Sequence, residues 1–269
     1  IKDFIVFCSN MFSNNNSTLN KIVRFEREYY HKTPVWWYTS ENFVYSMLNR
    51  ALRIQEVDKI VKMGFFIHDL HQQIENLHLA QVDDRQKSFI VYRGQNLSKR
   101  DFEKLIQSKD GLISFNNFLS TSEDRDVAFA FAESSSSNPN LAGILFEITI
   151  DPSISTAPFA RIDEYTNYSS EKEIMFSMHT VFRITEIKAS NDNNNLWIVK
   201  LKITNDNDPL INALTVRIRQ ETQDSTGWHR LGRLLVRLGH FDKAEQVYLT
   251  ILDQSTFDED KASVFNQLG

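Results

Sequence analysis

The pattern of hydrophobic positions divides the chain near residue 89. Before that point, apolar residues recur at intervals of three and four, which is the spacing of one helix face. This pattern predicts helices over residues 43–52 and 63–79, while the polar stretch 13–20 predicts a loop. The first third of the chain is therefore expected to be helical.

After residue 89, short apolar and β-branched runs predict strands, separated by loops rich in Ser, Asn and Asp. The strands are expected at residues 89–92, 118–121, 143–150, 173–178, 181–187 and 196–203. Helices over 98–108 and 123–133 interrupt the series, and Ser122 is a candidate cap for the second of them. The fold class that follows is α+β, with an N-terminal helical part packed on sheets that form a β-sandwich.

The pattern changes again after the polar segment 205–209. A helix is expected over 210–221, and the residues that follow include Leu231-Gly232, Ala244 and Tyr248. Their spacing resembles a tetratricopeptide repeat, a helix–turn–helix unit of about 34 residues in which a small residue lets the paired helix approach. A plain helical hairpin is the alternative. A single repeat cannot bury a solenoid core, so we expect the chain to come from a longer protein with further repeats.

These changes in pattern predict three parts. The expected boundaries are 1–206 for the α+β domain, 207–224 for a connecting helix or linker, and 225–269 for one repeat and the start of a second.

Composition excludes several classes of function. With 24% charged and 41% hydrophobic residues, the 269-residue chain has the balance of an ordinary globular protein. A net charge of −5 gives no electrostatic reason to expect nucleic acid as a partner. No apolar run approaches the length of about 20 residues that spans a bilayer, so no membrane segment is expected. The glycines form no Gly-x-Gly-x-x-Gly or phosphate-binding loop, which argues against a Rossmann cradle.

Three histidines lie along the edge of the apolar stripe of the helix predicted over 63–79. His68 and His71 are three residues apart, a spacing that allows two ligands to share a metal ion. No second cluster supplies the remaining ligands, so these residues and His78 are interpreted as boundary residues of an amphipathic helix. No metal is expected.

Three short motifs carry candidate chemistry. They are Arg93-Gly94 after the first predicted strand, the Ser120-Thr-Ser segment on the second, and Glu171-Lys-Glu173 at the start of another. Side chains two apart on a strand share a face, so the two glutamates would project side by side if the strand continues through them. Paired carboxylates suit chemistry on a developing oxocarbenium ion. Taken singly, each motif is more typical of an ordinary structural or surface position than of an active site.

In this order and on separate strands, the three motifs resemble the arginine-specific mono-ADP-ribosyltransferases over most of residues 20–204. The resemblance implies that NAD is the co-substrate and lies in a cleft between sheets. By the same resemblance, Arg93 would hold the pyrophosphate through its planar guanidinium, and Gly94 would offer its backbone to the nicotinamide carboxamide. Asn117 would contact a ribose, and Phe131 would stack on the nicotinamide ring.

The resemblance also assigns the reacting groups. Ser120 would position the nicotinamide ribose and Glu173, while Glu173 would bond the ribose 2′-hydroxyl and face the cation formed as nicotinamide leaves. Glu171 would bind the incoming guanidinium, and Tyr168 would meet the acceptor. Relatives that modify other acceptors commonly carry Gln at the position of Glu171, so a carboxylate there favours a protein acceptor with an exposed arginine.

Two alternatives to this transferase remain. An NAD glycohydrolase would use the same Arg93, Ser120 and Glu173 with water as acceptor, and a non-catalytic protein would use only the repeats, as a scaffold for a protein partner. Extracellular members of the resembled family often carry disulfides. Because Cys8 is the single cysteine of this chain, a reducing, cytoplasmic setting is expected.

Overall fold

The computed structural model divides the chain into two compact units. It describes residues 1–40, 43–81, 87–134, 138, 140–153, 157–166, 172–190, 195–205, 208–213, 216, 227–237 and 241–254. The first unit comprises Ile1–Ser46 and Phe66–Asn205, and the second comprises Met47–Phe65 and Asp206–Gly269. Met47–Phe65 therefore packs with the C-terminal part of the chain, although it lies early in the sequence.

Helices form the N-terminal part of the first unit, as predicted. They are α1 (Lys2–Met11), α2 (Asn16–Glu28), the short 3₁₀ helix η1 (Tyr29–His31), α3 (Pro34–Thr39), the start of α4 (Phe43–Ile54) and most of α6 (Gly64–Ala80). The loop predicted over 13–20 is wrong from Asn16 onward, because α2 begins there. The Asn15 side chain accepts a hydrogen bond from the backbone N–H of Thr18, so a polar stretch starts a helix instead of a loop.

An aromatic cluster holds these helices together around Phe25, which is fully buried on α2. Its ring lies 4.9 Å from that of Trp37 on α3 and 5.0 Å from that of Tyr29, both measured between centroids. Phe4, Phe43 and Phe66 complete the cluster from three other helices. Edge-to-face contacts of this kind add to the hydrophobic contribution of each ring.

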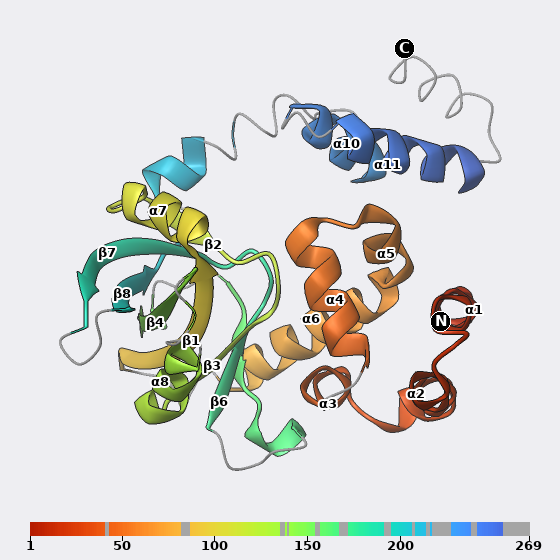
Figure 1. Cartoon of the computed structure of the whole chain (residues 1–269), viewed down its shortest axis with the longest axis horizontal. Coiled ribbons are helices and arrows are strands. Elements are labelled where there is room, and N and C mark those ends of the chain that lie inside the picture. Colours follow the sequence, from red (N-terminus) through yellow and green to blue (C-terminus); the bar gives the residue numbers. More distant parts are fainter. Residues whose placement is uncertain are drawn as a thin grey trace. The chain divides into compact units, whose positions relative to one another are not determined.

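All six predicted strands are present in one eight-stranded sheet (Figure 1). The strands are β1 (Phe89–Ser98), β2 (Leu112–Ser114), β3 (Leu119–Ser122), β4 (Leu141–Ile150), β5 (Phe159–Arg161), β6 (Glu173–Phe176), β7 (Val181–Ala189) and β8 (Leu196–Ile203). Their order is β2-β7-β8-β4-β1-β3-β6-β5, and among these pairs only β4 and β8 run parallel. The pattern did not predict β2 and β5, which have three residues each.

The expected sandwich of separate sheets is replaced by one continuous sheet that folds back on itself. Phe176 on β6 and Phe182 on β7 belong to strands near opposite ends of the order, yet their ring centroids lie 5.6 Å apart. Both rings belong to one buried cluster with side chains of β1, β4 and β8. The link between the halves is narrow, because β1 and β3 share only the register pair Tyr92↔Ser122. The two halves of one sheet thus enclose a core like that of a sandwich, while the hydrogen-bonded order of the strands stays continuous.

Helices α7 (Lys99–Gln107) and α8 (Arg125–Glu133) lie close to the predicted ranges. The cap of α8 is Asp124, whose side chain accepts from the N–H of Asp126, so the expected cap at Ser122 is corrected. The Ser122 hydroxyl accepts from the Asp124 N–H one step earlier, which organises the turn before the helix. The Ser122 hydroxyl and the Asp124 carboxylate therefore share the role at the start of α8 that the sequence assigned to Ser122 alone.

The second unit is helical in its described part. Helices α5 (Val57–Lys62), α10 (Gly227–Arg237) and α11 (Phe241–Gln254) share a buried cluster that includes Val57, Leu235 and Val247. A Cβ atom added to Gly232 would lie 2.5 Å from the Tyr248 ring, so α10 and α11 approach closely at this glycine. The close approach agrees with either a repeat or a plain hairpin. Most of the helix predicted over 210–221, and Leu268-Gly269, lie outside the described residues.

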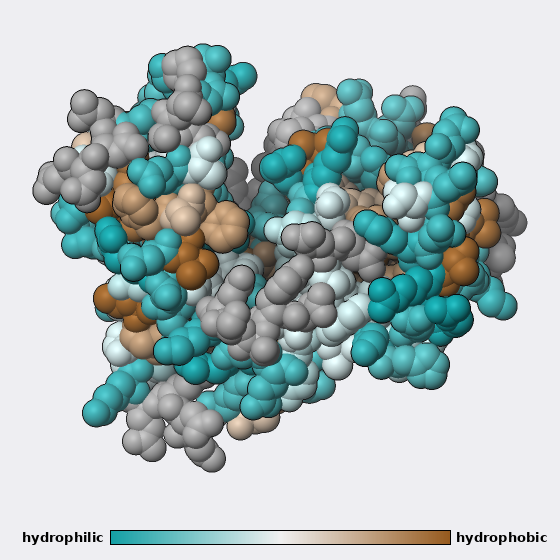
Figure 2. Space-filling view, turned by 60° about the horizontal axis from the view of Figure 1, so that its bottom comes forward, coloured by the Kyte–Doolittle hydropathy of each residue, from teal (hydrophilic) through white to brown (hydrophobic). Residues whose placement is uncertain are grey.

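The visible surface is mostly hydrophilic, with hydrophobic residues in small groups (Figure 2). In the part of the chain that the structure describes, no helix combines the length and apolar character needed to cross a lipid bilayer.

Candidate active site

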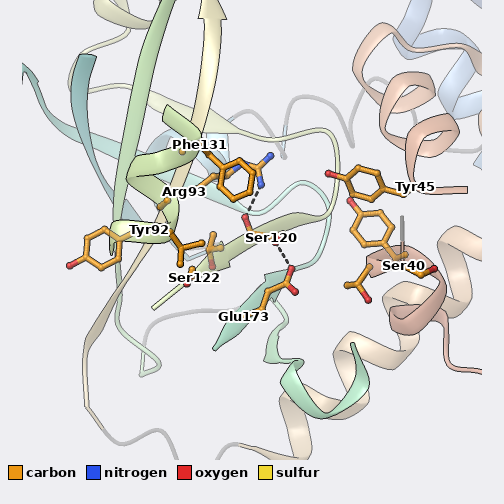
Figure 3. A pocket seen from close by; sticks show the side chains of 14 residues that line it. Ser40, Tyr45, Tyr92, Arg93, Ser120, Ser122, Phe131 and Glu173 are labelled. Carbon is orange, nitrogen blue, oxygen red and sulfur yellow. Dashed lines mark hydrogen bonds between the residues drawn. The ribbon is translucent and has the colours of Figure 1, made fainter. Parts of the chain in front are cut away.

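A cavity of about 490 Å³ lies in the first unit, on the side of the sheet where β1, β3 and β6 meet (Figure 3). Its volume falls within the range of small-molecule sites, roughly 300–1,000 Å³. It is lined by Tyr38, Thr39, Ser40, Tyr45, Tyr92, Arg93, Gly94, Ser120, Thr121, Ser122, Val127, Ala128, Phe131 and Glu173. Five of the residues singled out in the sequence therefore share one cavity.

Ser120 joins the other two polar groups at the centre of the cavity. Its backbone carbonyl accepts a hydrogen bond from Nη1 of Arg93 at 2.7 Å, and its hydroxyl donates to Oε1 of Glu173. Arg93 Nε also donates to Gln95 at 3.3 Å. These bonds use two of the five N–H donors of the guanidinium and fix its plane, and the remaining donors suit an anionic ligand. Ser120 thus connects the Arg93 guanidinium, through its backbone carbonyl, with the Glu173 carboxylate, through its hydroxyl.

Strand register explains how distant sequence segments meet here. β3 lies between β1 and β6, so the arginine, serine and glutamate motifs occupy three adjacent strands. Ser120 pairs with Met175, which places Glu173 diagonally opposite on the same face of the sheet. The hydroxyl of Ser120 reaches the Glu173 carboxylate across this diagonal.

Strand β6 begins at Glu173, and Lys172 before it has a φ of 41°, which lies in the left-handed region. The alternation of side chains along β6 therefore starts at Glu173. That both glutamates share a strand face stays a prediction. Glu171 and Tyr168 themselves lie outside the described residues.

Gly94 has a packing role that the sequence did not indicate. A Cβ atom there would lie 1.8 Å from the carbonyl oxygen of Ala128, and one at Gly143 would lie 2.4 Å from that of Ala132. Both contacts are with the backbone of α8, which has no room to accommodate them. The two glycines therefore allow α8 to lie directly on β1 and β4.

The close approach of α8 brings Phe131 to the rim of the cavity, where the side chain is 62% exposed. An exposed aromatic ring beside polar groups is available to stack on a planar ligand. Asn117, on the loop before β3, is half-buried and is not among the residues that line the cavity. The site geometry thus supports Phe131 and gives no support to Asn117.

The sequence did not single out the helical wall of the cavity, formed by Tyr38, Thr39 and Ser40 at the end of α3 and by Tyr45 on α4. The Tyr38 hydroxyl donates to the carbonyl of Phe118 at 3.0 Å, which ties α3 to the residue before β3. The two tyrosine rings pack with centroids 5.1 Å apart. These residues reach the cavity through contacts between segments that are distant in sequence, so no local sequence pattern identifies them.

The three histidines of α6 have separate partners. His68 lies beside Asp69, Nδ1 of His71 lies 2.6 Å from the Ser177 hydroxyl, and Nδ1 of His78 lies 2.9 Å from the Phe159 carbonyl. They do not converge on one point, which agrees with the interpretation of boundary residues. Among the described residues, no group of three His, Cys, Asp or Glu side chains is arranged to hold a metal ion.

The comparison with protein families gives one match. Residues 32–205 match the model of a family described as ADP-ribosyltransferase exoenzyme, a range that contains every residue of the cavity. A search of curated proteins gave no match.

Among solved structures, the chain is similar to several ADP-ribosyltransferases. The Vis enzyme, a toxin of Vibrio splendidus, in complex with agmatine shares 20% identity with a TM-score of 0.46, over 65% of this chain and 74% of that one. HopU1 of Pseudomonas syringae shares 19% identity with a TM-score of 0.47, over 73% and 87%. C3stau2 of S. aureus, solved with NAD, shares 17% identity with a TM-score of 0.45, over 64% and 85%. Family membership rests on the family match, not on these similarities.

Proposed function

The chain belongs to the ADP-ribosyltransferase exoenzyme family, whose members transfer ADP-ribose from NAD, and on this premise we propose that its acceptor is an arginine side chain of a protein. Nicotinamide is the product that leaves. The observation that supports the use of NAD is the set of hydrogen bonds that join Arg93, Ser120 and Glu173 in one cavity, and the carboxylate of Glu171 is what supports an arginine acceptor.

Arg93 is assigned to the pyrophosphate of NAD. Its guanidinium is oriented by Ser120 and Gln95, and a planar fork with donors to spare suits bidentate binding of phosphate oxygens. Phe131 is assigned to the nicotinamide ring, since its exposed side chain lines the same cavity. The backbone of Gly94, which lines the same cavity, is assigned to the carboxamide.

Glu173 is assigned to the ribose next to nicotinamide. As the bond between the ribose carbon and the nicotinamide nitrogen breaks, the electron pair leaves with nicotinamide and positive charge develops on the sugar. A carboxylate in a part-buried site stabilises that charge more than it would in water. The Ser120 hydroxyl, which donates to Glu173, holds the carboxylate in place for this step.

Glu171 is assigned to the acceptor. An arginine nitrogen attacks the sugar cation and then loses a proton, and a guanidinium with a pKa above about 12 must first be oriented rather than deprotonated. A carboxylate at this position supports arginine, because relatives with other acceptors commonly carry Gln there. Tyr168, on the same loop, is assigned to the surface of the acceptor protein.

The experiment that tests the proposal separates the two glutamates. Glu173→Gln should lose both transfer and nicotinamide release, on the order of 10²–10³-fold, because it acts on the sugar cation. Glu171→Gln should lose transfer to agmatine while hydrolysis of NAD continues. Both variants are assayed for nicotinamide release with and without agmatine, and circular dichroism checks their folding.

Two outcomes would contradict the assignment. Nicotinamide release by the unchanged protein that agmatine does not alter, and no labelled agmatine, would identify an NAD glycohydrolase instead. A fully active Glu173→Gln variant would remove Glu173 from the reaction.

The helices of the second unit are proposed to be part of a tetratricopeptide array that recruits a protein partner. The close packing of Gly232 against Tyr248, with Ala244 buried on the same helix, is compatible with such a repeat as it is with a plain hairpin, and the proposal rests on the sequence spacing. The end of the family match at residue 205 supports a boundary of the transferase domain near 206. A cytoplasmic setting is proposed from the single cysteine alone.

A further inference from the structure

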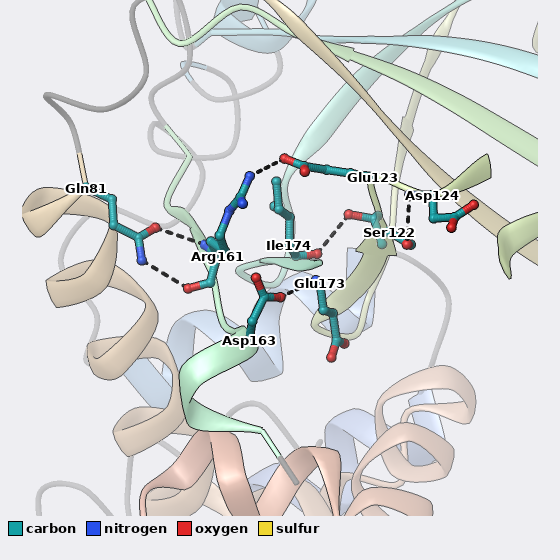
Figure 4. Close-up of polar contacts among 9 residues, drawn as sticks. Gln81, Ser122, Glu123, Asp124, Arg161, Asp163, Glu173 and Ile174 are labelled. Carbon is teal, nitrogen blue, oxygen red and sulfur yellow. Dashed lines mark hydrogen bonds and ion pairs between the residues drawn. The ribbon is translucent and has the colours of Figure 1, made fainter. Parts of the chain in front are cut away.

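The backbone of Glu173 is held from the side of β5. The Asp163 carboxylate accepts a hydrogen bond from the Glu173 N–H (Figure 4). The Glu173 carbonyl accepts from the N–H of Ile162 at 3.0 Å. Strand β5 ends at Arg161, paired with Ile174, so Glu173 lies one position beyond the last register pair. Asp163 therefore supplies the partner that β5 no longer provides, through a charge-assisted bond.

The described residues next to Asp163 and Glu173 are also held. The Tyr165 N–H donates to the Ile162 carbonyl at 2.8 Å, which forms a tight turn around Asp163. The Lys172 carbonyl accepts from the N–H of Glu123 at 3.3 Å. Asp163 and Glu173 therefore both lie in segments whose backbone is fixed by hydrogen bonds.

Asp163 is itself anchored through β5 and α6. The Gln81 side-chain amide donates to the Arg161 carbonyl at 3.0 Å and accepts from the Arg161 N–H at 2.9 Å, as a neighbouring strand would. The Arg161 side chain forms an ion pair with Glu123, which follows β3 on the other side of β6 (Figure 4). The start of β6 is therefore supported from both neighbouring strands.

We propose that Asp163 is a positioning residue, which sets the place of Glu173 by holding its backbone N–H. The proposal rests on the proposed function, because it assigns Glu173 to the sugar. The carboxylate of Glu173 belongs to the first residue of β6, and without the bond to Asp163 the backbone at that residue would shift. A displacement of about 1 Å costs on the order of 10²-fold in rate.

The test uses two substitutions at Asp163. Asp163→Ala removes the acceptor of the Glu173 N–H and should lower kcat for nicotinamide release on the order of 10²-fold with little change in KM for NAD. Asp163→Asn keeps a carbonyl oxygen at the same distance and should restore most of the rate. Asp151→Ala is the matched control, because Asp151 likewise accepts from a backbone N–H, that of Ser153 at 3.1 Å, but this bond does not involve Glu173.

A purely structural role would lower thermal stability in Asp163→Ala and Asp151→Ala alike while kcat per folded molecule stayed normal, and that result would overturn the proposal. If Asp163→Ala does not fold, Asp163→Glu replaces it. The longer side chain keeps the charge and the acceptor but displaces the Glu173 backbone, so a normal kcat in this variant would also overturn the proposal.

A different result would show that the proposed function is wrong. An unchanged protein that hydrolyses NAD but does not modify agmatine would refute the arginine assignment, while the hydrolysis rates of the Asp163 variants would still decide the role of Asp163.

Discussion

On the strand side of the cavity, hydrogen bonds join Arg93, Ser120 and Glu173. On the side of α8, by contrast, Phe131 is carried by a helix that approaches the sheet where Gly94 and Gly143 have no side chains. The first arrangement depends on hydrogen bonds between polar groups, and the second on the lack of a Cβ atom at the two glycines. Hydrogen bonds fix the direction of a polar group. Close packing fixes the position of a whole helix and leaves the exposed ring free to adapt to a ligand.

This difference predicts opposite sensitivities. Substitutions on the strand side should change binding and catalysis while the fold remains, because each affects one polar group. Substitutions beneath α8 should change stability first, because the backbone of the helix must move.

The largest effect is expected for Gly94→Ala. The added methyl group meets the Ala128 carbonyl, so α8 must shift, and the free energy of unfolding should fall by about 3 kcal/mol. Urea unfolding measures this loss. Gly64→Ala is the control, since a Cβ atom there meets nothing within 4 Å and should not destabilise the protein. Equal stability of the two variants would show that α8 is not held by close packing.

A smaller effect is expected for Arg93→Lys, on the strand side. Lysine keeps the charge but loses the planar fork, so NAD affinity should fall by about 2 kcal/mol, the range of a charge-assisted hydrogen bond. Calorimetry with NAD measures the change, and urea unfolding should show normal stability. The control is Arg183→Lys, because Arg183 bonds the Asp110 carbonyl away from the cavity. Unchanged affinity of Arg93→Lys would remove Arg93 from the pyrophosphate role.

The smallest effect is expected for Phe131→Leu. Leucine keeps the apolar surface and loses the ring, so NAD affinity should fall by about 1 kcal/mol, the contribution typical of an aromatic contact. Stability should not change, because the side chain is largely exposed. Tyr30→Leu serves as control, as Tyr30 is exposed outside the cavity. A large loss of stability in Phe131→Leu would mean that the ring supports α8 rather than a ligand.

The sequence was sufficient for the longer elements because their hydrophobic pattern is strong. Strands such as β4 and β8 and the helix α6 were predicted close to their observed bounds. β2 and β5 were missed because three residues are too few to show a period. The helix α2 was not predicted, and its start was assigned to a loop because Asn15 caps a helix whose first turn is polar.

Within the site, prediction succeeded for residues that carry a motif and failed for those placed by tertiary contacts. Arg93, Ser120 and Glu173 were singled out and converge, whereas Tyr38 and Tyr45 depend on the packing of α3 and α4. The positive φ of Lys172 could not be foreseen, because lysine is not a residue type that marks left-handed backbone.

The pairing of Gln81 with Arg161 has a consequence for the edge of the sheet. β5 is the last strand in the order, and the exposed edge of a last strand is where proteins commonly recruit partners by adding a strand. Here the peptide groups of Arg161 are already engaged by a side-chain amide, and His78 lies against the carbonyl of Phe159. Side chains from the helical part of the unit thus take the place of a ninth strand and close the β5 edge to β-augmentation.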